Sequence, residues 1–484
     1  MSETPFLDEP ELVAAEAIRQ KPRRGDLTQG PVAKTLLLFA LPTLGANILQ
    51  SLNVSTSAIY VGKFLGENAF AAAGIATMVM QLIFSTVFGL AVAATIMIGQ
   101  AMGRRDMEEV RRTIGATTGT FILAGLGFAM MGHLAIPTFL RLLATPPAAF
   151  EYARTFLEVV FFGLPILFLN LLTQSALRGV GDAVTPFWSN VLNLGLSIVV
   201  NPVLILGLGP FPAMGLAGAA LSGVCANLIC LIFMVFRIYQ RNLPIALRGS
   251  ELHLLRPDWQ HLRPVLTIGL PMGLSMIIMT MSAVVMMGLI NREGVETIAA
   301  FNATNQILNY IQMPAFAIGG AVSAMAAQNI GAGRWDRINH LAAAGVTFAT
   351  VLTGFLLLIL LTTSEHLLGV FLPSGSPAIA IGNHISWLIG WTFIPMGISM
   401  VMTTIVRANG AAIPPLLILI FSVIIVRMAV GFALYPTFRA DAIWWAFMAS
   451  STCSALMAIA YYRYGSWRKG SPLASRRGEP APAE

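Results

Sequence analysis

The residues from Thr35 to Gly62 form a run of 28 residues without a single Lys, Arg, Asp or Glu. About 20 apolar residues in a helix cross the hydrocarbon core of a bilayer, so this run predicts a membrane-spanning helix with some tilt. The rest of the chain has the same character: 56% of its residues are hydrophobic and 11% are charged. A soluble domain carries about 25% charged residues. The sequence therefore predicts an all-α polytopic membrane protein.

Twelve apolar segments are long enough to span a membrane. They cover residues 34–61, 69–101, 113–139, 155–177, 186–207, 214–238, 265–290, 297–329, 341–367, 378–406, 413–435 and 442–464. Six spans are expected in a lobe over residues 31–238 and six in a lobe over residues 264–465. Residues 239–263 are expected to link the lobes, and residues 1–30 and 466–484 to form polar tails.

The basic residues predict the orientation of these spans. If the N-terminus is cytoplasmic, the cytoplasmic segments hold 23 of the 29 Lys and Arg residues, and the exterior holds five. Short cytoplasmic loops are enriched in Lys and Arg, so both termini are expected to be cytoplasmic. The net charge of +7 comes from basic residues in short loops between the spans, where they act as topology signals. No nucleic-acid partner is therefore expected.

The two halves of the chain repeat one another at a spacing of 228 or 229 positions. The repeated landmarks are Leu41-Pro42 with Leu270-Pro271, Gln100 with Gln328, Arg178 with Arg407, and Pro186 with Pro415. Six spans per half is an even number, so both halves enter the membrane in the same direction. The sequence therefore predicts two parallel six-helix repeats with a transport site between them.

Several segments resemble the multidrug and toxic compound extrusion (MATE) family of secondary transporters, in the order that the family has them. They are LTQGPVAKTLLLFALPTLG, AIYVGKFLG, GQAMGRRD, LRGVGDAVTP, PVLILGLGPFPAMGLAGAALS, RPDWQHLRPVLTIGLPMG and QNIGAGRWD. The resemblance implies a V-shaped, two-lobed bundle. It also implies cation-coupled export of organic compounds by alternating access.

The chain departs from the family at the acidic positions that the resemblance implies for cation binding. Ser57 stands at the acidic place of the first helix, and Asn201 at that of the fifth, in SIVVNP. Met279 and Met396 stand where another branch has acids in the seventh and tenth helices. The coupling ion, a proton or sodium, therefore stays open.

Polar side chains on three spans are candidates for a substrate cavity. Amides and hydroxyls on one side of a lipid-embedded helix indicate contact with protein or water. Interhelical hydrogen bonding is the alternative, because amides also hold membrane helices together. The candidates are Asn47, Gln50, Asn53 and Ser57 in the first span, Asn201 in the fifth, and Asn302, Asn305, Gln306, Asn309 and Tyr310 in the eighth.

Two charged residues inside spans need an explanation. Arg427 lies near the middle of the eleventh span, and buried arginines at such depth usually mark pathways. Its alternative role is a clamp on backbone carbonyls of a neighbouring helix. Glu158, in the fourth span, is a candidate for proton coupling. Its alternative is an ion pair with Arg154 at the membrane surface, four residues away on the same helix.

These features predict an antiporter that exports small organic compounds from the bacterial inner membrane. We expect a monomer without a cofactor or a metal site. A flippase for an anionic lipid-linked precursor, using cavity arginines, is the second hypothesis. An intramembrane enzyme is the third: Gly179-Val180-Gly181-Asp182 matches an aspartyl-protease signature, but that chemistry needs a second Asp in a span. A turn after the fourth helix explains this segment better, and no enzyme is expected.

Overall fold

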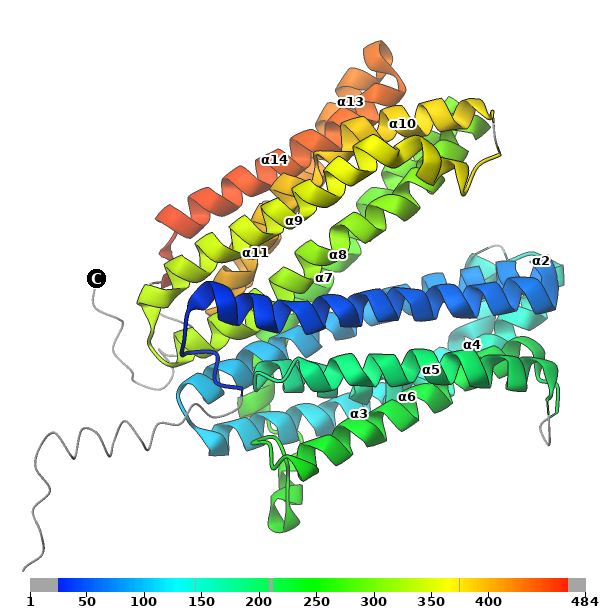
Figure 1. The fold of residues 1–484 in the computed structure, drawn as a ribbon. Helices are drawn as coiled ribbons and strands as arrows, with labels where there is room; N and C mark the ends of the chain where they lie inside the picture. Colours follow the sequence, from blue (N-terminus) through cyan, green and yellow to red (C-terminus); the bar gives the residue numbers. More distant parts are fainter. Residues whose placement is uncertain (1–24, 144, 209–211, 374, 469–484) are drawn as a thin grey trace, which may run out of the picture.

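The structure is a computed structural model that describes residues 25–143, 145–208, 212–373 and 375–468 (Figure 1). The helices of the first half are α2 (Val32–Gly103), α3 (Met107–Leu142), α4 (Pro147–Gly179), α5 (Val184–Leu206) and α6 (Gly215–Gln240). The helices of the second half are α7 (Trp259–Ile290), α8 (Val295–Gly331), α9 (Trp335–Gly369), α10 (Pro377–Gly390), α11 (Phe393–Ala408), α12 (Ile413–Ile420), α13 (Arg427–Phe438) and α14 (Ala440–Tyr464). Short 3-10 turns occupy η1 (Gly249–Leu255), η2 (Asn291–Glu293) and η4 (Ser466–Arg468).

The described residues contain twelve helices that are long and apolar enough to cross a membrane, which confirms the predicted spans. Their ends differ from the predictions where helices run on beyond the apolar core. The first span continues to Gly66, where a left-handed φ of 81° breaks α2 into two spans, Val32–Gly66 and Asn68–Gly103. Glycine accepts this conformation without the steric cost that a side chain would bring.

Two spans of the second half are interrupted. The tenth span consists of α10 and α11, separated by a turn at Trp391 and Thr392. Pro395 explains this break, because a proline cannot donate to the carbonyl four residues earlier and its ring clashes with that carbonyl. The Ser451 hydroxyl of α14 donates to the Thr392 carbonyl, at 2.8 Å. In the eleventh span a π-helical turn, Phe421–Val426, joins α12 to α13 directly before Arg427.

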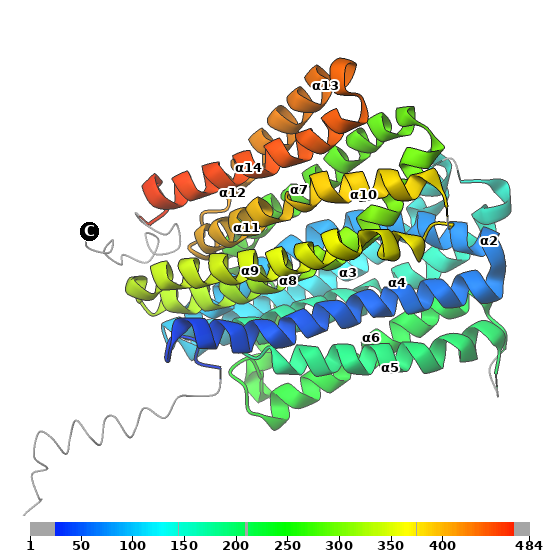
Figure 2. The same ribbon diagram turned by 45° about the horizontal axis from the view of Figure 1, so that its top comes forward.

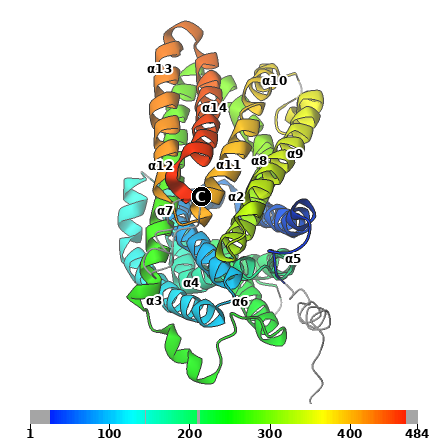
Figure 3. The ribbon, with the colours of Figure 1, turned by 90° about the vertical axis from the view of Figure 1, so that its left-hand side faces the viewer.

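The spans form two lobes arranged as a V. Figure 1 shows α2–α6 in one lobe and α7–α14 in the other, converging towards one end of the molecule and diverging towards the opposite end. Figure 3 looks onto the convergent end, where α2 and α7 lie between the other helices of the two lobes. The predicted V-shaped bundle of two six-helix repeats is therefore confirmed.

Each lobe has an apolar core, and a third core joins the lobes. The joining core contains Leu36 and Ile96 of the first lobe and Ile318, Val322 and Val406 of the second, all buried. Figure 2 shows α2 running beside α8 and α9, which supply much of this joint. The lobes are thus packed firmly at one end and have separate cores elsewhere.

Candidate functional site

Two glutamines connect the lobes at their convergent end. Gln100 of α2 donates its amide to the Ala408 carbonyl of the second lobe, at 2.6 Å. Gln328 of α8 donates to the Gly179 carbonyl of the first lobe, at 3.0 Å. The donors are 228 positions apart and the acceptors 229, so the repeat relates the two contacts. We call this part of the molecule the closed end.

Glycines let the backbones of the second and eighth spans touch at the closed end. A Cβ on Gly103 would lie 2.0 Å from the Gln328 carbonyl oxygen, and a Cβ on Gly331 would lie 2.1 Å from that of Gln100. No side chain fits at either position without moving one helix. These two positions also follow the spacing of the repeat.

The segment that precedes each lobe docks on the opposite lobe. Before the first span, the Leu27 N–H donates to the Gln328 side chain, at 2.9 Å, and the Asn329 amide donates to the Leu27 carbonyl, at 3.2 Å. At the start of the seventh span, His261 in the first turn of α7 lies 2.5 Å from Asp258, which precedes the helix, and 3.4 Å from Glu109 of α3. The Gln260 backbone N–H and the His261 contact lower the pKa of the Asp258 carboxyl below its usual value.

Polar side chains meet inside the first lobe, between the first and fifth spans. The Asn53 amide donates to the Asn193 side chain, at 2.8 Å, and the Asn201 amide donates to the Ser57 hydroxyl, at 3.2 Å. Asn201 is only 1% exposed. The side-chain carbonyl oxygens of Asn53 and Asn201 are buried and accept no hydrogen bond from a described group. The structure therefore pairs the predicted residue Asn53 with Asn193 and the predicted residues Ser57 and Asn201 with each other, and each pair contains one unused oxygen acceptor.

The other predicted cavity residues are arranged differently. The side chains of the eighth-span stripe are exposed, Tyr310 by 40%. Their side chains form no hydrogen bond with any group in the described part of the chain, which distinguishes them from amides that join helices. The stripe consists of Asn302, Asn305, Gln306, Asn309 and Tyr310. In the first span Gln50 is exposed and Asn47 half-buried.

Arg427 begins α13 and lies among α7, α13 and α14. Its Nε donates to the Ser450 hydroxyl, at 3.0 Å, and its Nη1 to the Ser282 hydroxyl, at 3.3 Å. The guanidinium carbon lies 4.4 Å from the ring centre of Phe447, a cation–π contact. The recorded partners are side chains, whereas the sequence-based alternative was a clamp on backbone carbonyls. No carboxylate within the described part of the chain forms an ion pair with Arg427.

The two remaining sequence candidates take simpler positions. Glu158 is half-exposed and accepts from the Nε of Arg154, at 3.0 Å, which is the geometry of the ion-pair alternative. Asp182 lies in the turn after α4, where it accepts from the Val184 and Thr185 backbone N–H groups and caps α5. The turn interpretation of the protease-like signature is thus confirmed.

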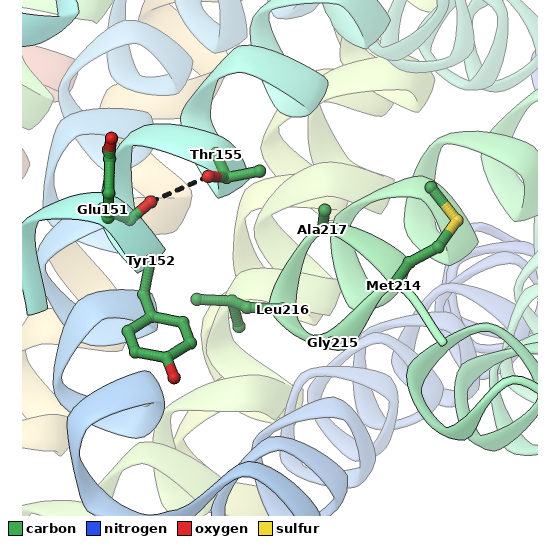
Figure 4. Close-up of a pocket in the computed structure, with 7 residues that line it drawn as sticks. All are labelled: Glu151, Tyr152, Thr155, Met214, Gly215, Leu216 and Ala217. Carbon is green, nitrogen blue, oxygen red and sulfur yellow. Dashed lines mark hydrogen bonds between the residues drawn. The ribbon is translucent and has the colours of Figure 1, made fainter. Parts of the chain in front are cut away.

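Two cavities lie away from these polar clusters. One has a volume of about 240 Å³ between the first turns of α4 and α6, with Glu151, Tyr152 and Met214 in its wall (Figure 4). The other is an apolar groove of about 330 Å³ between the lobes. It is lined by Leu37, Leu41 and Leu44 of the first span and by Pro314, Phe348 and Phe355 of the eighth and ninth.

Three residues of these polar sites were not predicted from the sequence: Asn193, Ser282 and Ser450. The repeat contains a signal for the first two. Ser282 lies 229 positions after Asn53. Ser422, in the π-helical turn before Arg427, lies 229 positions after Asn193. Adding 229 to the number of each polar residue of the first lobe would have predicted the corresponding polar positions of the second lobe.

Comparison with known proteins agrees with this architecture. The MatE family model matches residues 42–203 and again residues 271–433, so the two matches begin 229 positions apart. The chain is 29% identical over 440 residues to a probable multidrug resistance protein of Bacillus subtilis, YoeA, covering 90% of this chain and 95% of that protein. It is 23% identical over 395 residues to an FAD transporter of Shewanella oneidensis, covering 80% and 84%.

Solved structures show the same fold. A MOP superfamily transporter from Pyrococcus furiosus, described as having a binding pocket of reverse polarity, superposes with a TM-score of 0.85 at 19% identity, covering 93% of this chain and 99% of that one. An outward-facing multidrug resistance MATE transporter superposes with a TM-score of 0.84 at 20% identity, covering 92% and 98%. With two matches to the family model that follow its internal repeat, this chain belongs to the MatE family of multidrug and toxic compound extrusion transporters.

Proposed function

We propose that the protein is an antiporter that exports small organic compounds by alternating access between its two lobes. The observation that carries this proposal is the closed end, where repeat-related contacts from Gln100 and Gln328 join the lobes. Rocking of two such repeats about a fixed site moves a substrate across the membrane without large changes inside either lobe. The exposed amide stripe of α8 supplies hydrogen-bonding groups for an organic substrate.

We further propose that the closed end faces the cytoplasm of a bacterial inner membrane and that the protein works as a monomer. The distribution of Lys and Arg supports this orientation. The relatives named as multidrug resistance proteins support small organic substrates, and the one named as an FAD transporter supports an organic anion.

Between the two candidate ions, the interior of the first lobe favours sodium. Sodium is a hard cation and takes oxygen ligands, and the Asn53 and Asn201 carbonyls offer two that no described donor occupies. The Ser57 hydroxyl lies beside Asn201, at 3.2 Å from its amide nitrogen. Neutral amides do not take up protons at physiological pH, so the cluster has no group for proton exchange.

Transport by purified protein in liposomes tests this function. Movement of FAD and of ethidium should be measured under an imposed sodium gradient and, separately, under an imposed proton gradient. We expect the sodium gradient to accelerate transport of at least one of the two probes. Transport that neither gradient accelerates would contradict the antiporter.

A disulfide across the closed end tests whether transport requires this end to open. An ideal Cβ on Gly99 lies 2.8 Å from the Ala327 Cβ, so cysteines at these positions need only a small helix shift to form a disulfide. In a background without native cysteines, the oxidised Gly99→Cys, Ala327→Cys protein should stop transporting and recover on reduction. Unchanged transport by the oxidised protein would contradict opening at this end.

A flippase for an anionic lipid-linked precursor remains the second candidate, because a specific feature favours it. The apolar groove between the first span and α8 and α9 has room for part of an acyl chain between the lobes. Arg427 would then bind the anionic head group. Movement of a fluorescent anionic lipid between leaflets, measured in the same liposomes, distinguishes this activity from export of soluble compounds.

A further inference from the structure

Arg427 is a deep cation whose charge is not neutralised by the described groups around it. It lies 14 residues after Ile413 and 11 before Phe438, the ends of its span. At 1.5 Å per residue the nearer end is roughly 16 Å away, too far for the side chain to reach easily. An arginine at this depth of a membrane is costly, and the neutral hydroxyls of Ser282 and Ser450 do not neutralise its charge.

The hydrogen bonds leave one side of the guanidinium available. Nε and Nη1 donate to the two serines, whereas Nη2 donates to no described group. Arg427 is partly exposed, so the protein does not enclose its side chain completely. The Ser450 hydroxyl donates to the Phe447 carbonyl, at 3.0 Å. The Ser282 hydroxyl accepts from Nη1 and donates its own proton to no group among the described residues.

The repeat shows that this cationic site is specific to the second lobe. Ser282 corresponds to Asn53 of the polar cluster in the first lobe, and Arg427 corresponds to Ile198. Each lobe therefore has a polar interior between equivalent spans, uncharged in the first and cationic in the second. The two lobes differ in charge here because the position that holds Ile198 in the first lobe holds Arg427 in the second.

We propose that Arg427 and Ser282 bind an oxyanion, a carboxylate or a phosphate, of the molecule that the protein transports. A guanidinium presents a planar set of N–H donors that matches the geometry of both anions, and bonds to a charged acceptor are about twice as strong as neutral ones. Nη2 and the Ser282 hydroxyl supply the donors, and Phe447 and Ser450 hold the guanidinium in place. The oxyanion belongs to a soluble organic anion or to a lipid head group.

This inference rests on the proposed transport function for its substrate, but its test is a binding measurement without a gradient. Full-length protein in phosphatidylcholine nanodiscs should be titrated with 1-naphthyl phosphate and 2-naphthoate. The neutral counterparts are 1-naphthol and 2-naphthamide. We expect each anion to bind more tightly than its neutral counterpart. If neither anion is preferred by the wild type, the proposal is wrong.

Variants then assign the preference to the site. Arg427→Gln should weaken binding of the anions about tenfold to a hundredfold and leave the neutral compounds unchanged. Arg427→Lys should recover part of the loss, because lysine keeps the charge but not the planar fork. The matched control is Arg292→Gln, which removes an exposed arginine and should bind as the wild type does. Anion binding by Arg427→Gln at wild-type strength would contradict the proposal.

Ser282→Ala keeps the test decisive if Arg427→Gln does not fold. It removes one proposed donor and leaves the arginine in place, so anion binding by the folded protein should weaken several-fold. Undiminished anion binding by this variant would remove Ser282 from the site and contradict the proposal as stated.

Nanodiscs that also contain phosphatidylglycerol identify the source of the oxyanion. Competition with 1-naphthyl phosphate would assign the site to a lipid head group, and lack of competition would assign it to soluble anions. Either result supports the oxyanion chemistry. Failure of transport alongside intact anion preference would contradict only the proposed function, and transport without any anion preference would contradict only this inference.

Discussion

Gln100 and Gln328 make equivalent hydrogen bonds in opposite directions across the joint between the lobes. Each projects from its own lobe and donates to a backbone carbonyl of the other, Gln100 to Ala408 and Gln328 to Gly179. Both glutamines are buried at the closed end. A pair of contacts related by the repeat can form or break together, so the joint behaves as one element of a two-state transition.

Replacing Gln328 should loosen the closed end. Gln328→Ala removes the bond to Gly179 and leaves the Leu27 N–H without its acceptor. An unsatisfied buried group costs about 1–3 kcal/mol, so the population should shift towards separation of the lobes at this end. Distances between spin labels placed across the joint measure the shift. Gln81→Ala, at an exposed position of α2 in the first lobe, is the control, and a Gln328→Ala distribution identical to it would refute the prediction.

A methyl group at Gly103 should force the joint apart by steric contact. Its Cβ would lie 2.0 Å from the Gln328 carbonyl oxygen, which is backbone and cannot rotate away. Overpacking of this kind costs about 1–3 kcal/mol, which thermal unfolding of the purified protein would detect. Gly74→Ala is the matched control, because it lies in the same helix with nothing within 4 Å of its Cβ. Equal stability of the two variants would show that the close approach does not contribute.

The sequence predicted the spans and the repeat because both are carried by residue types at regular spacing. A long uncharged run must be helical in lipid whatever its neighbours are. The partners of Gln100 and Asn53 could not be predicted in this way, since Ala408 and Asn193 reach them only through the packing of distant spans. The break in the tenth span had a local signal in Pro395, which the sequence analysis did not use.

The predicted orientation can be tested by labelling single cysteines on intact cells. In a background without Cys225, Cys230 and Cys453, a cysteine at Asn68 should react with an impermeant thiol reagent from outside. A cysteine at Gly249, in the segment between the lobes, should react only after the membrane is opened. The predicted outer loops also contain Gly209 and Ser374, which lie outside the described residues. Labelling of a cysteine at Gly249 in intact cells would show that the orientation, and with it the direction of transport, is the opposite of the one predicted.

Glu158 distinguishes proton coupling from a surface ion pair. Its carboxylate lies 3.0 Å from Arg154 on the same helix, and both side chains are substantially exposed. Exposed pairs of this kind contribute about 0.2–1 kcal/mol. We therefore expect Glu158→Gln to change thermal stability little and to leave ion-driven transport at the wild-type rate.

The coupling role makes the opposite prediction for the same variant. A carboxyl group that takes up a proton from outside and releases it inside is indispensable for proton coupling. If Glu158 has this role, the Glu158→Gln protein would still bind substrate but would lose proton-driven transport. Arg154→Gln separates the two roles, because it breaks the ion pair and keeps the carboxylate. Loss of proton-driven transport in Glu158→Gln alone would establish Glu158 as the coupling residue. It would also overturn our preference for sodium at Asn53 and Asn201, since the polar cluster would no longer be needed to explain coupling.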